Sequence, residues 1–352
     1  MAAAGDGRLT LIDVARGAAA PALAQRRLPA GTTAWVLSDG KIGDEVQCFG
    51  IAEELGLRPE RRLIAPRPPW SWLTPWGPID PREGPDRRGS AIAPPFPDIV
   101  LAAGRRTVPY LRRVKSASGG RTFTIFVKDP YTGTGTADVI WIPEHDRLRG
   151  DNVVATLTPA HRLRPEVLAA ARAEPDPRIA ALPHPRVAMV LGGKGVNHDF
   201  SDQDIANLAG IAATIVGAGG SLMVTPSRRT PPAALTAIRE ALAGALGDRR
   251  AFVWNGEGNN PYPQILAHAS AILVTGDSAN MVGEACVTGV PVHVYEPSGG
   301  HPKVTRYLDR LTEVGAIRRW AGRLEQWSYE PIDSAPVTAA AIAERYRAFR
   351  GG

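Results

Sequence analysis

Residues 271–297 read AILVTGDSANMVGEACVTGVPVHVYEP, and this stretch decides the fold class. Two apolar runs, at 271–274 and 290–295, flank a segment whose apolar residues recur at helical spacing. The pattern predicts a strand, a short amphipathic helix and a second strand. The length of the segment and its Gly-Pro punctuation suit a βαβ crossover, in which both strands lie parallel in one sheet. We therefore expect an α/β fold.

Polar side chains stand where the first of these strands ends and the helix begins. Asp277 and Ser278 follow the strand closely, and Asn280 lies in the first turn of the predicted helix. In open α/β sheets, ligands bind at the carboxyl ends of the strands. The three residues are therefore candidates for a binding site, with Ser278 as the N-cap of the helix.

Length and composition indicate a globular protein of two domains. The chain has 352 residues, which is more than one hydrophobic core usually organises. A hydrophobic content of 44% with 22% charged residues argues against a disordered or fibrous chain. The net charge of +6 would suit an anionic partner, but no run of five like charges occurs, and we expect no nucleic-acid partner.

Neither the cysteines nor the apolar runs indicate a disulfide framework or a membrane span. The two cysteines, Cys48 and Cys286, fall in predicted helices, and the sequence has no CxxC pair. No apolar run reaches the 18 residues typical of a transmembrane helix. Residues 1–30 lack the apolar core of a secretory signal, so we expect a loose leader on a cytoplasmic protein. A mitochondrial transit peptide is the alternative.

Residues 31–160 alternate predicted strands and helices, which is typical of a doubly wound parallel sheet. A strand at 33–38, a glycine-containing turn and a helix at 44–55 predict a half-site for an anion. A Pro-rich insertion at 66–97 carries Trp70, Trp72, Trp76 and Phe96 in its sequence. Its aromatic side chains could pack on the domain, cover a cleft, or touch a membrane or an apolar acceptor.

A linker is expected at 161–185, followed by a second α/β domain at 186–335 and a last helix at 336–352. The turn Gly192-Gly193-Lys194 ends the strand at 186–191 without the spacing of a Walker loop, and it places Lys194 to meet negative charge. After the strand at 221–225, adjacent arginines at 228 and 229 could clamp a diphosphate, or simply be solvated.

Three motifs together resemble the ELM family, named for plant mitochondrial fission factors and common in bacteria. They are SDGK at 38–41 with GDEVQ at 43–47, TPSRRT at 225–230, and TGDS at 275–278 with the helix that follows. The resemblance implies a GT-B-like architecture: two Rossmann-like domains facing a cleft, with the C-terminal helix crossing back to the first domain. It spans the chain from about residue 33 to the C-terminus.

The resemblance also implies a nucleotide-sugar site in the second domain. Its diphosphate would be lined by residues of three turns and of the helix that follows: Gly192, Gly193, Lys194, Ser227, Arg228, Asp277, Ser278 and Asn280. Glu284, one turn into the helix, resembles the acidic residue that often binds the donor ribose. Asp277 would repel a diphosphate unless it bonds a sugar hydroxyl or Arg228 lies close.

The first-domain turn departs from the family pattern, because Asp44 stands where many members have a histidine. Asp44 could act as a general base for an acceptor hydroxyl, or it could simply stabilise the start of its helix. We expect an inverting, metal-independent glycosyltransferase without a resident cofactor, which transfers sugar from an NDP-sugar to an envelope or lipid-linked acceptor. Peripheral contact with the inner membrane is left open.

Two other functions are alternatives to glycosyl transfer. A non-catalytic GT-B-fold scaffold related to mitochondrial fission factors is the alternative from another class. A sugar-nucleotide epimerase that uses NAD is disfavoured, because the sequence lacks both a GxGxxG turn and a Tyr-x-x-x-Lys pair.

Overall fold

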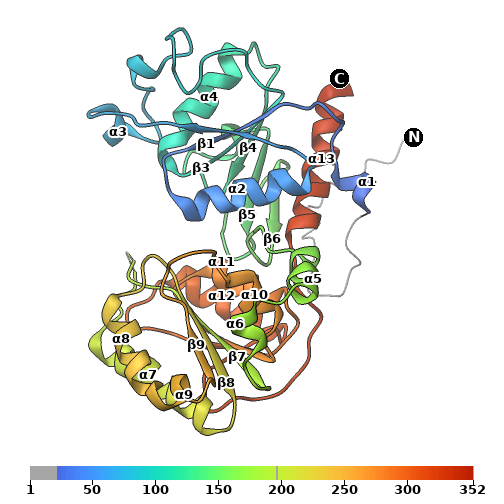
Figure 1. Ribbon diagram of the computed structural model, residues 1–352. Coiled ribbons are helices and arrows are strands. Elements are labelled where there is room, and N and C mark those ends of the chain that lie inside the picture. The colour runs from blue at the N-terminus through green and yellow to red at the C-terminus, as the bar shows by residue number, and fades with distance from the viewer. Residues whose placement is uncertain (1–21, 196, 352) are drawn as a thin grey trace. The chain divides into compact units, whose positions relative to one another are not determined.

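The computed structural model describes residues 22–195 and 197–351, and the chain forms two compact units (Figure 1). The first unit combines the chain up to Arg162 with the chain from Ser334 onward, and the second is Leu163–Asp333. Each unit is built on a six-stranded parallel sheet. The predicted α/β class with two Rossmann-like units is thus confirmed.

The sheet of the first unit has the strand order β2-β1-β3-β4-β5-β6. Four of its strands are fully buried, as expected for a parallel sheet with helices on both faces. The strands are β1 Ala34–Ser38, β2 Glu60–Leu63, β3 Ile99–Ala103, β4 Phe123–Val127, β5 Val139–Pro143 and β6 Val153–Thr156.

Helices cover the two faces of this sheet with separate apolar clusters. On one face, α2 (Ile42–Glu54) and the C-terminal helix α13 (Ala335–Gly351) pack on the strands. On the other face lies α4 (Val108–Ala117). Phe123 of the sheet meets Tyr346 of α13 edge to face, with ring centroids 5.4 Å apart. The last helix therefore crosses back to the first unit, as the family resemblance implied.

The sheet of the second unit has the strand order β12-β11-β10-β7-β8-β9. The strands are β7 Arg186–Leu191, β8 Ser221–Pro226, β9 Ala251–Val253, β10 Ala271–Thr275, β11 Val292–Tyr295 and β12 Ile317–Arg319. The helices are α5 Pro165–Ala173, α6 Pro177–Ala180, α7 Asp202–Gly217, α8 Pro232–Ala241, α9 Ala243–Gly247, α10 Tyr262–Ala267, α11 Ala279–Cys286 and α12 Pro302–Glu313. β10 and β11 pair in parallel with α11 between them in the chain, so the predicted βαβ crossover is confirmed.

The segment expected as a linker, 161–185, is instead a packed part of the second unit from Leu163 onward. It holds α5 and α6, whose Leu168 and Ile179 are buried. The Arg172 guanidinium donates to the carbonyl of Ala267 at 3.0 Å and so ties α5 to α10. The prolines that suggested a linker stand at the first turn of each helix, where a missing N–H costs nothing.

The loose leader expected at 1–30 falls partly outside the described residues, which begin at 22. From there the chain forms a short helix, α1 (Leu23–Arg26). Arg26 of this helix pairs with Glu54 at 2.9 Å, and the Leu28 amide donates to the carbonyl of Leu55 at 2.9 Å. The described end of this segment is therefore attached to α2.

No helix in the ranges 22–195 and 197–351 is long and apolar enough to cross a membrane.

Candidate functional site

The carboxyl edge of the second sheet brings three turns together. β7 lies between β8 and β10, and the turns 192–195, 227–230 and 276–278 follow these three strands. The strand order reverses at β7, because the chain proceeds to β8 on one side and returns to β10 on the other. Ligands of open α/β sheets bind at such a switch point. The turns predicted to form a site are therefore neighbours in the structure.

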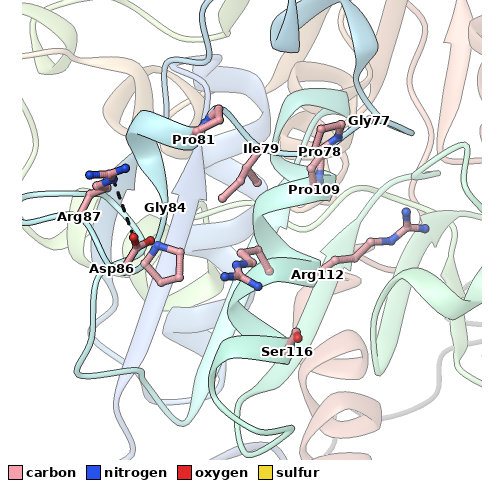
Figure 2. Close-up of a pocket in the computed structure, with 12 residues that line it drawn as sticks. Gly77, Pro78, Ile79, Pro81, Gly84, Asp86, Arg87, Pro109, Arg112 and Ser116 are labelled. Carbon is pink, nitrogen blue, oxygen red and sulfur yellow. Dashed lines mark ion pairs between the residues drawn. The ribbon is translucent and has the colours of Figure 1, made fainter.

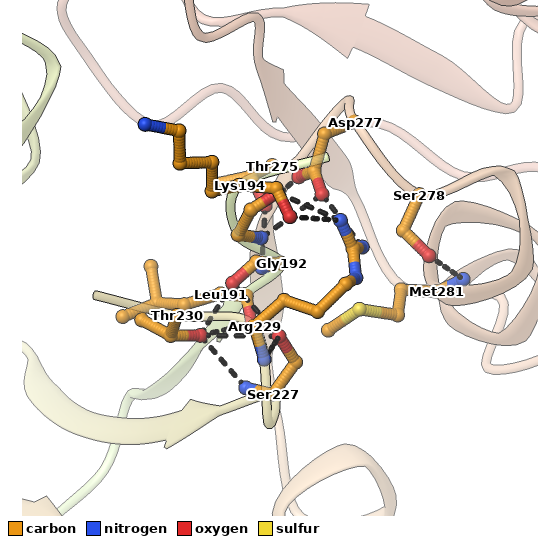
Figure 3. A network of polar contacts seen from close by, with 11 residues as sticks. Leu191, Gly192, Lys194, Ser227, Arg229, Thr230, Thr275, Asp277, Ser278 and Met281 are labelled. Carbon is orange, nitrogen blue, oxygen red and sulfur yellow. Dashed lines mark hydrogen bonds and ion pairs between the residues drawn. The ribbon is translucent and has the colours of Figure 1, made fainter. Parts of the chain in front are cut away.

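Asp277 is the centre of this cluster (Figure 3). Its side chain is fully buried. It accepts hydrogen bonds from the Thr275 hydroxyl at 2.7 Å, the Gly193 amide at 3.0 Å and the Arg229 guanidinium at 2.9 Å. A buried carboxylate is stable only when it is paired and hydrogen-bonded. Arg229, and not its neighbour Arg228, therefore neutralises Asp277 and ties together the ends of three strands.

The two glycines after β7 are explained by the same packing. A Cβ on Gly192 would lie 2.1 Å from Asp277 Oδ1, and a Cβ on Gly193 would lie 2.1 Å from the Arg229 backbone. Real Cβ atoms are essentially never found this close to other atoms, so only glycine fits at either position. The Gly193 amide is also occupied by Asp277. The close approach of the two turns thus accounts for both glycines without a ligand.

Ser227 closes the turn after β8 onto the turn after β7. Its hydroxyl donates to the Gly192 carbonyl at 2.9 Å, and the Thr230 hydroxyl donates to the same carbonyl. The Arg229 guanidinium reaches the Gly193 carbonyl at 2.7 Å. Ser227 therefore holds its turn in place, and that turn presents Arg228 to solvent.

Two cations at this edge are not used by the internal network. Lys194 and Arg228 are exposed, and neither side chain has a hydrogen bond or an ion pair with any residue in the described ranges. In Figure 3 the Lys194 side chain points away from the Asp277 cluster. Both are available for an anionic ligand, and Arg could hold it bidentately.

Helix α11 begins beside these turns and carries the other predicted residues. Ser278 is its N-cap, as predicted, with the hydroxyl 3.5 Å from the Met281 amide that it accepts from. Asn280 lies in the first turn and Glu284 in the second. The Tyr262 hydroxyl donates to Glu284 at 2.7 Å. Burial and the Glu284 carboxylate raise the pKa of Tyr262 well above its usual range, so Tyr262 stays a donor.

The first unit has a switch point of its own, because β1 lies between β2 and β3. Asp44, in the first turn of α2, stands at this edge and pairs with Lys128, at 2.5 Å between Oδ1 and Nζ. Lys128 follows β4 directly and has φ +78°, a backbone region that lysine rarely adopts. The Lys128 amide donates to the Trp141 carbonyl at 2.7 Å, which fixes this conformation. Asp44 is thus held by a cation that the sequence did not reveal.

Asp39 is a functional candidate that the sequence analysis missed. It follows β1 directly, and its side chain is only 2% exposed. Neither carboxylate oxygen accepts a hydrogen bond from the described residues, and the nearest cation is Lys41, 3.4 Å from Oδ2. Asp39 could have been identified from its position in the sequence. It follows the first strand of a doubly wound sheet, and the strand order of such a sheet reverses at that strand.

The anion half-site expected at the start of α2 is disfavoured by its charges. Asp39, Asp44 and Glu45 stand at or just before the beginning of the helix, and they pair with Lys41, Lys128 and Arg61 respectively. Carboxylates already occupy the positive end of the helix dipole. Because each carboxylate is paired with one cation, no net positive charge remains there to attract a further anion.

The insertion at 66–97 is folded rather than structureless. Arg67 forms a two-pronged ion pair with the buried Asp80, at 2.6 and 2.7 Å, and Tyr110 of α4 donates to Glu83. A hollow of about 590 Å³ separates the insertion from α4 (Figure 2). Its lining includes Pro78, Ile79, Pro81, Pro109, Arg112 and Arg113. Of the four aromatic side chains, Trp72 and Trp76 are 75% and 71% exposed, whereas Trp70 and Phe96 are partly buried.

In the described part of the chain, no three His, Cys, Asp or Glu side chains are grouped to hold a metal ion. Cys48 and Cys286 are free and buried, and burial raises the pKa of both thiols well above the usual range. Thiolate chemistry is therefore not expected of either cysteine.

Comparison with known proteins identifies relatives over most of the chain. The family model described as mitochondrial fission ELM1 matches residues 42–346. The mitochondrial fission protein ELM1 of Arabidopsis thaliana is 27% identical over 282 residues, which cover 72% of this chain and 65% of the plant protein. An uncharacterized protein of Rickettsia prowazekii is 27% identical over 165 residues, or 44% of this chain and 45% of that protein. The matches thus span less than two thirds of the length of these relatives.

Among solved structures, the UDP-GlcNAc 2-epimerase from Methanocaldococcus jannaschii is similar, with a TM-score of 0.51. The match covers 91% of this chain and 99% of the epimerase, at 11% sequence identity. At this identity the likeness concerns the fold, which is of the GT-B type, and not the reaction.

Proposed function

The chain belongs to the mitochondrial fission ELM1 family, and we propose that its second unit binds a nucleoside-diphosphate sugar. The observation that carries the proposal is a pair of exposed cations at the carboxyl edge of the sheet. Lys194 stands on the turn after β7, and Arg228 stands on the turn after β8. Free cations and the amides at a helix N-terminus together favour a diphosphate. The epimerase of similar fold is named for a nucleotide sugar, which supports this class of ligand.

The residues of the second unit divide between ligand contact and support. Lys194 and Arg228 hold the diphosphate, while Ser278 starts the helix whose amides face it. Asn280 donates and accepts hydrogen bonds with the sugar or ribose hydroxyls, and Glu284 accepts hydrogen bonds from them. The supporting residues are Gly192, Gly193, Ser227 and Asp277, which fix the turns through Arg229.

The reaction that suits such a donor is an inverting glycosyl transfer. The acceptor oxygen forms a bond to the anomeric carbon, the bond from that carbon to the diphosphate oxygen breaks, and the electron pair leaves with the nucleoside diphosphate. The proton of the acceptor hydroxyl passes to a carboxylate, for which Asp44 is the sequence candidate. Lys194 and Arg228 stabilise the negative charge that develops on the leaving group.

The acceptor is proposed to be an envelope or lipid-linked glycan, reached by peripheral contact with a membrane. The support for this contact is the exposed pair Trp72 and Trp76, since Trp favours the headgroup region of a bilayer.

A non-catalytic scaffold is the second candidate, and one observation favours it. The carboxylate of Asp277 already occupies the Gly193 amide at the switch point, where a nucleotide phosphate would otherwise bind. Arabidopsis thaliana ELM1 is named for mitochondrial fission rather than for sugar transfer. In that case the fold would serve to recruit partners.

Isothermal titration with UDP-, GDP- and ADP-sugars tests the proposal. The wild-type protein should bind at least one of them, and Arg228→Gln should weaken that binding about tenfold or more. Arg249→Gln is the matched control, because Arg249 is an exposed arginine before β9, at the opposite edge of the same sheet. If a folded protein gives no heat with any nucleotide sugar, the proposal fails and the scaffold stands.

A further inference from the structure

We propose that the carboxyl edge of the first unit's sheet binds the hydroxyl groups of an uncharged polyol, with Asp39 as the principal acceptor. The proposal concerns side chains of the first unit only. It goes beyond nucleotide binding by the second unit and does not depend on it. Only the assignment of the polyol as a glycosyl acceptor rests on the proposed function.

The first step is the state of the Asp39 carboxylate. Its side chain is 98% buried, yet both oxygens lack a hydrogen-bond donor among the described residues. Leaving a buried charged group without such donors is costly. Asp277, at the switch point of the other sheet, shows the satisfied form, since it is equally buried and accepts three hydrogen bonds. A fold that leaves Asp39 unsatisfied leaves room for donors from a ligand.

The second step is what surrounds Asp39. A Cβ placed on Gly104 would lie 3.3 Å from Asp44 Oδ2 and 3.7 Å from Asp39 Oδ1, so both carboxylates border the same space. Gly104 has φ +88°, a conformation that favours glycine, and it follows β3 directly. Lys128, in its left-handed conformation, holds Asp44 from the end of β4. Strained backbone of this kind is concentrated at functional sites.

The third step is the charge of the site, which selects the ligand class. Asp39 and Asp44 are opposed by the ammonium groups of Lys41 and Lys128, at 3.4 and 2.5 Å. The four formal charges cancel, so neither a cation nor an anion gains a large net attraction. Hydrogen-bond acceptors nevertheless remain free on Asp39. An uncharged molecule with neighbouring hydroxyl groups supplies two donors to one carboxylate and meets this demand.

Three sugars of one ring type separate these classes of ligand. Glucose is neutral, glucosamine carries a cation, and glucuronate carries an anion. Saturation-transfer NMR and titration with each at millimolar concentration should show glucose binding, with no preference of tenfold or more for either charged sugar. Binding confined to glucosamine or glucuronate, or no binding of glucose to wild-type protein, would overturn the proposal.

Two variants locate the site. Asp39→Asn should weaken glucose binding about tenfold or more, because a neutral amide accepts hydrogen bonds less strongly than a carboxylate. Asp151→Asn is the matched control, since Asp151 is exposed and precedes β6 at the amino edge of the same sheet. Equal binding by wild-type protein and Asp39→Asn would contradict the assignment.

Thermal unfolding separates a ligand-binding role from a structural one. Without ligand, Asp39→Asn should unfold at the same temperature as wild-type protein or higher, because it removes an unsatisfied buried charge. A lower unfolding temperature would mean that Asp39 supports the fold, and would overturn the proposal. The nucleotide-sugar titration of the second unit is a separate measurement, so failure of one proposal is distinguished from failure of the other.

Discussion

At the scale of single residues, two buried aspartates occupy comparable places and differ in one respect. Asp277 and Asp39 both lie at the end of a strand next to a switch point. Asp277 is satisfied by a hydroxyl, an amide and a guanidinium, whereas Asp39 accepts no hydrogen bond from the described residues. Burial alone therefore does not separate a supporting carboxylate from a binding one. The hydrogen-bond partners do.

The first prediction concerns Asp277. Asp277→Asn should destabilise the second unit by about 1.5–3 kcal/mol, because it weakens three buried hydrogen bonds and leaves the Arg229 charge without its partner. Denaturant unfolding of the variant beside Arg228→Gln measures this effect. Arg228 has no partner among the described residues, so its substitution should leave stability within experimental error. A stable Asp277→Asn variant would refute the supporting role.

The second prediction concerns pH and Asp204, in the first turn of α7. Although burial opposes the charged form, hydrogen bonds from Ser298, Ser201 and Tyr295 lower the pKa of Asp204 to about 2 from its ordinary 3.8. A lowered folded-state pKa means that the stability gained is present above pH 4 and is lost as the pH falls toward 2.

Thermal unfolding between about pH 4 and pH 2 tests that linkage. The wild-type protein should lose stability more steeply over this range than Asp204→Asn, which has no carboxylate to protonate. Asp202→Asn is the matched control, because Asp202 is exposed and lies two residues before Asp204 in the first turn of the same helix. Parallel pH profiles for wild-type protein and Asp204→Asn would contradict the prediction.

At the scale of elements, the insertion at 66–97 presents apolar side chains from a rigid base. The Arg67–Asp80 pair joins two parts of the insertion, and the Tyr110–Glu83 hydrogen bond fixes the insertion to α4. Trp72, Leu73 and Trp76 nevertheless remain exposed around α3 (Trp70–Leu73). Large apolar groups held in water by a fixed scaffold are a feature of surfaces that meet an apolar partner.

The third prediction follows from these tryptophans. A Trp72→Ser/Trp76→Ser variant should bind anionic phospholipid vesicles about tenfold or more weakly than wild-type protein, since interfacial binding scales with buried apolar area. Its unfolding temperature should not change, because both side chains are exposed. Tyr131→Ser serves as the control, as Tyr131 is an exposed aromatic residue of the same unit outside the insertion. Vesicle binding that survives the double substitution would exclude membrane contact through α3.

At the scale of the whole molecule, the apolar runs and their spacing were sufficient to predict both parallel sheets. The strands β3, β7 and β10 contain continuous apolar runs at 99–103, 187–191 and 271–274, and buried parallel strands have this composition. The short strand β12 was not predicted, and the segment that holds α5 and α6 was interpreted as a linker with a short helical pattern. The prolines of α5 and α6 were interpreted as breakers, although they stand at helix starts.

The candidate site was predictable in position but not in its pairings. Which turns follow adjacent strands can be inferred from the sequence, since a doubly wound sheet has few possible strand orders. The side chains of the site pair across turns that lie far apart in the sequence, such as Arg229 and Asp277, which are 48 residues apart. The directions of these side chains decide which arginine pairs with Asp277 and whether Asp39 finds donors. Hydrophobic periodicity carries no information about such contacts. The sequence analysis considered Arg228 or a sugar hydroxyl as the partner of Asp277, whereas the structure pairs Asp277 with Arg229.

The central claim is that the turns at the carboxyl edge of the second sheet bind a nucleotide sugar. Hydrogen–deuterium exchange with and without a panel of UDP-, GDP- and ADP-sugars tests it most directly. With at least one of them, we predict added protection at 193–195, 227–230 and 276–284, and none at the amino edge of the same sheet. Unchanged exchange at these turns with every nucleotide sugar, or protection confined to other parts of the chain, would contradict the account.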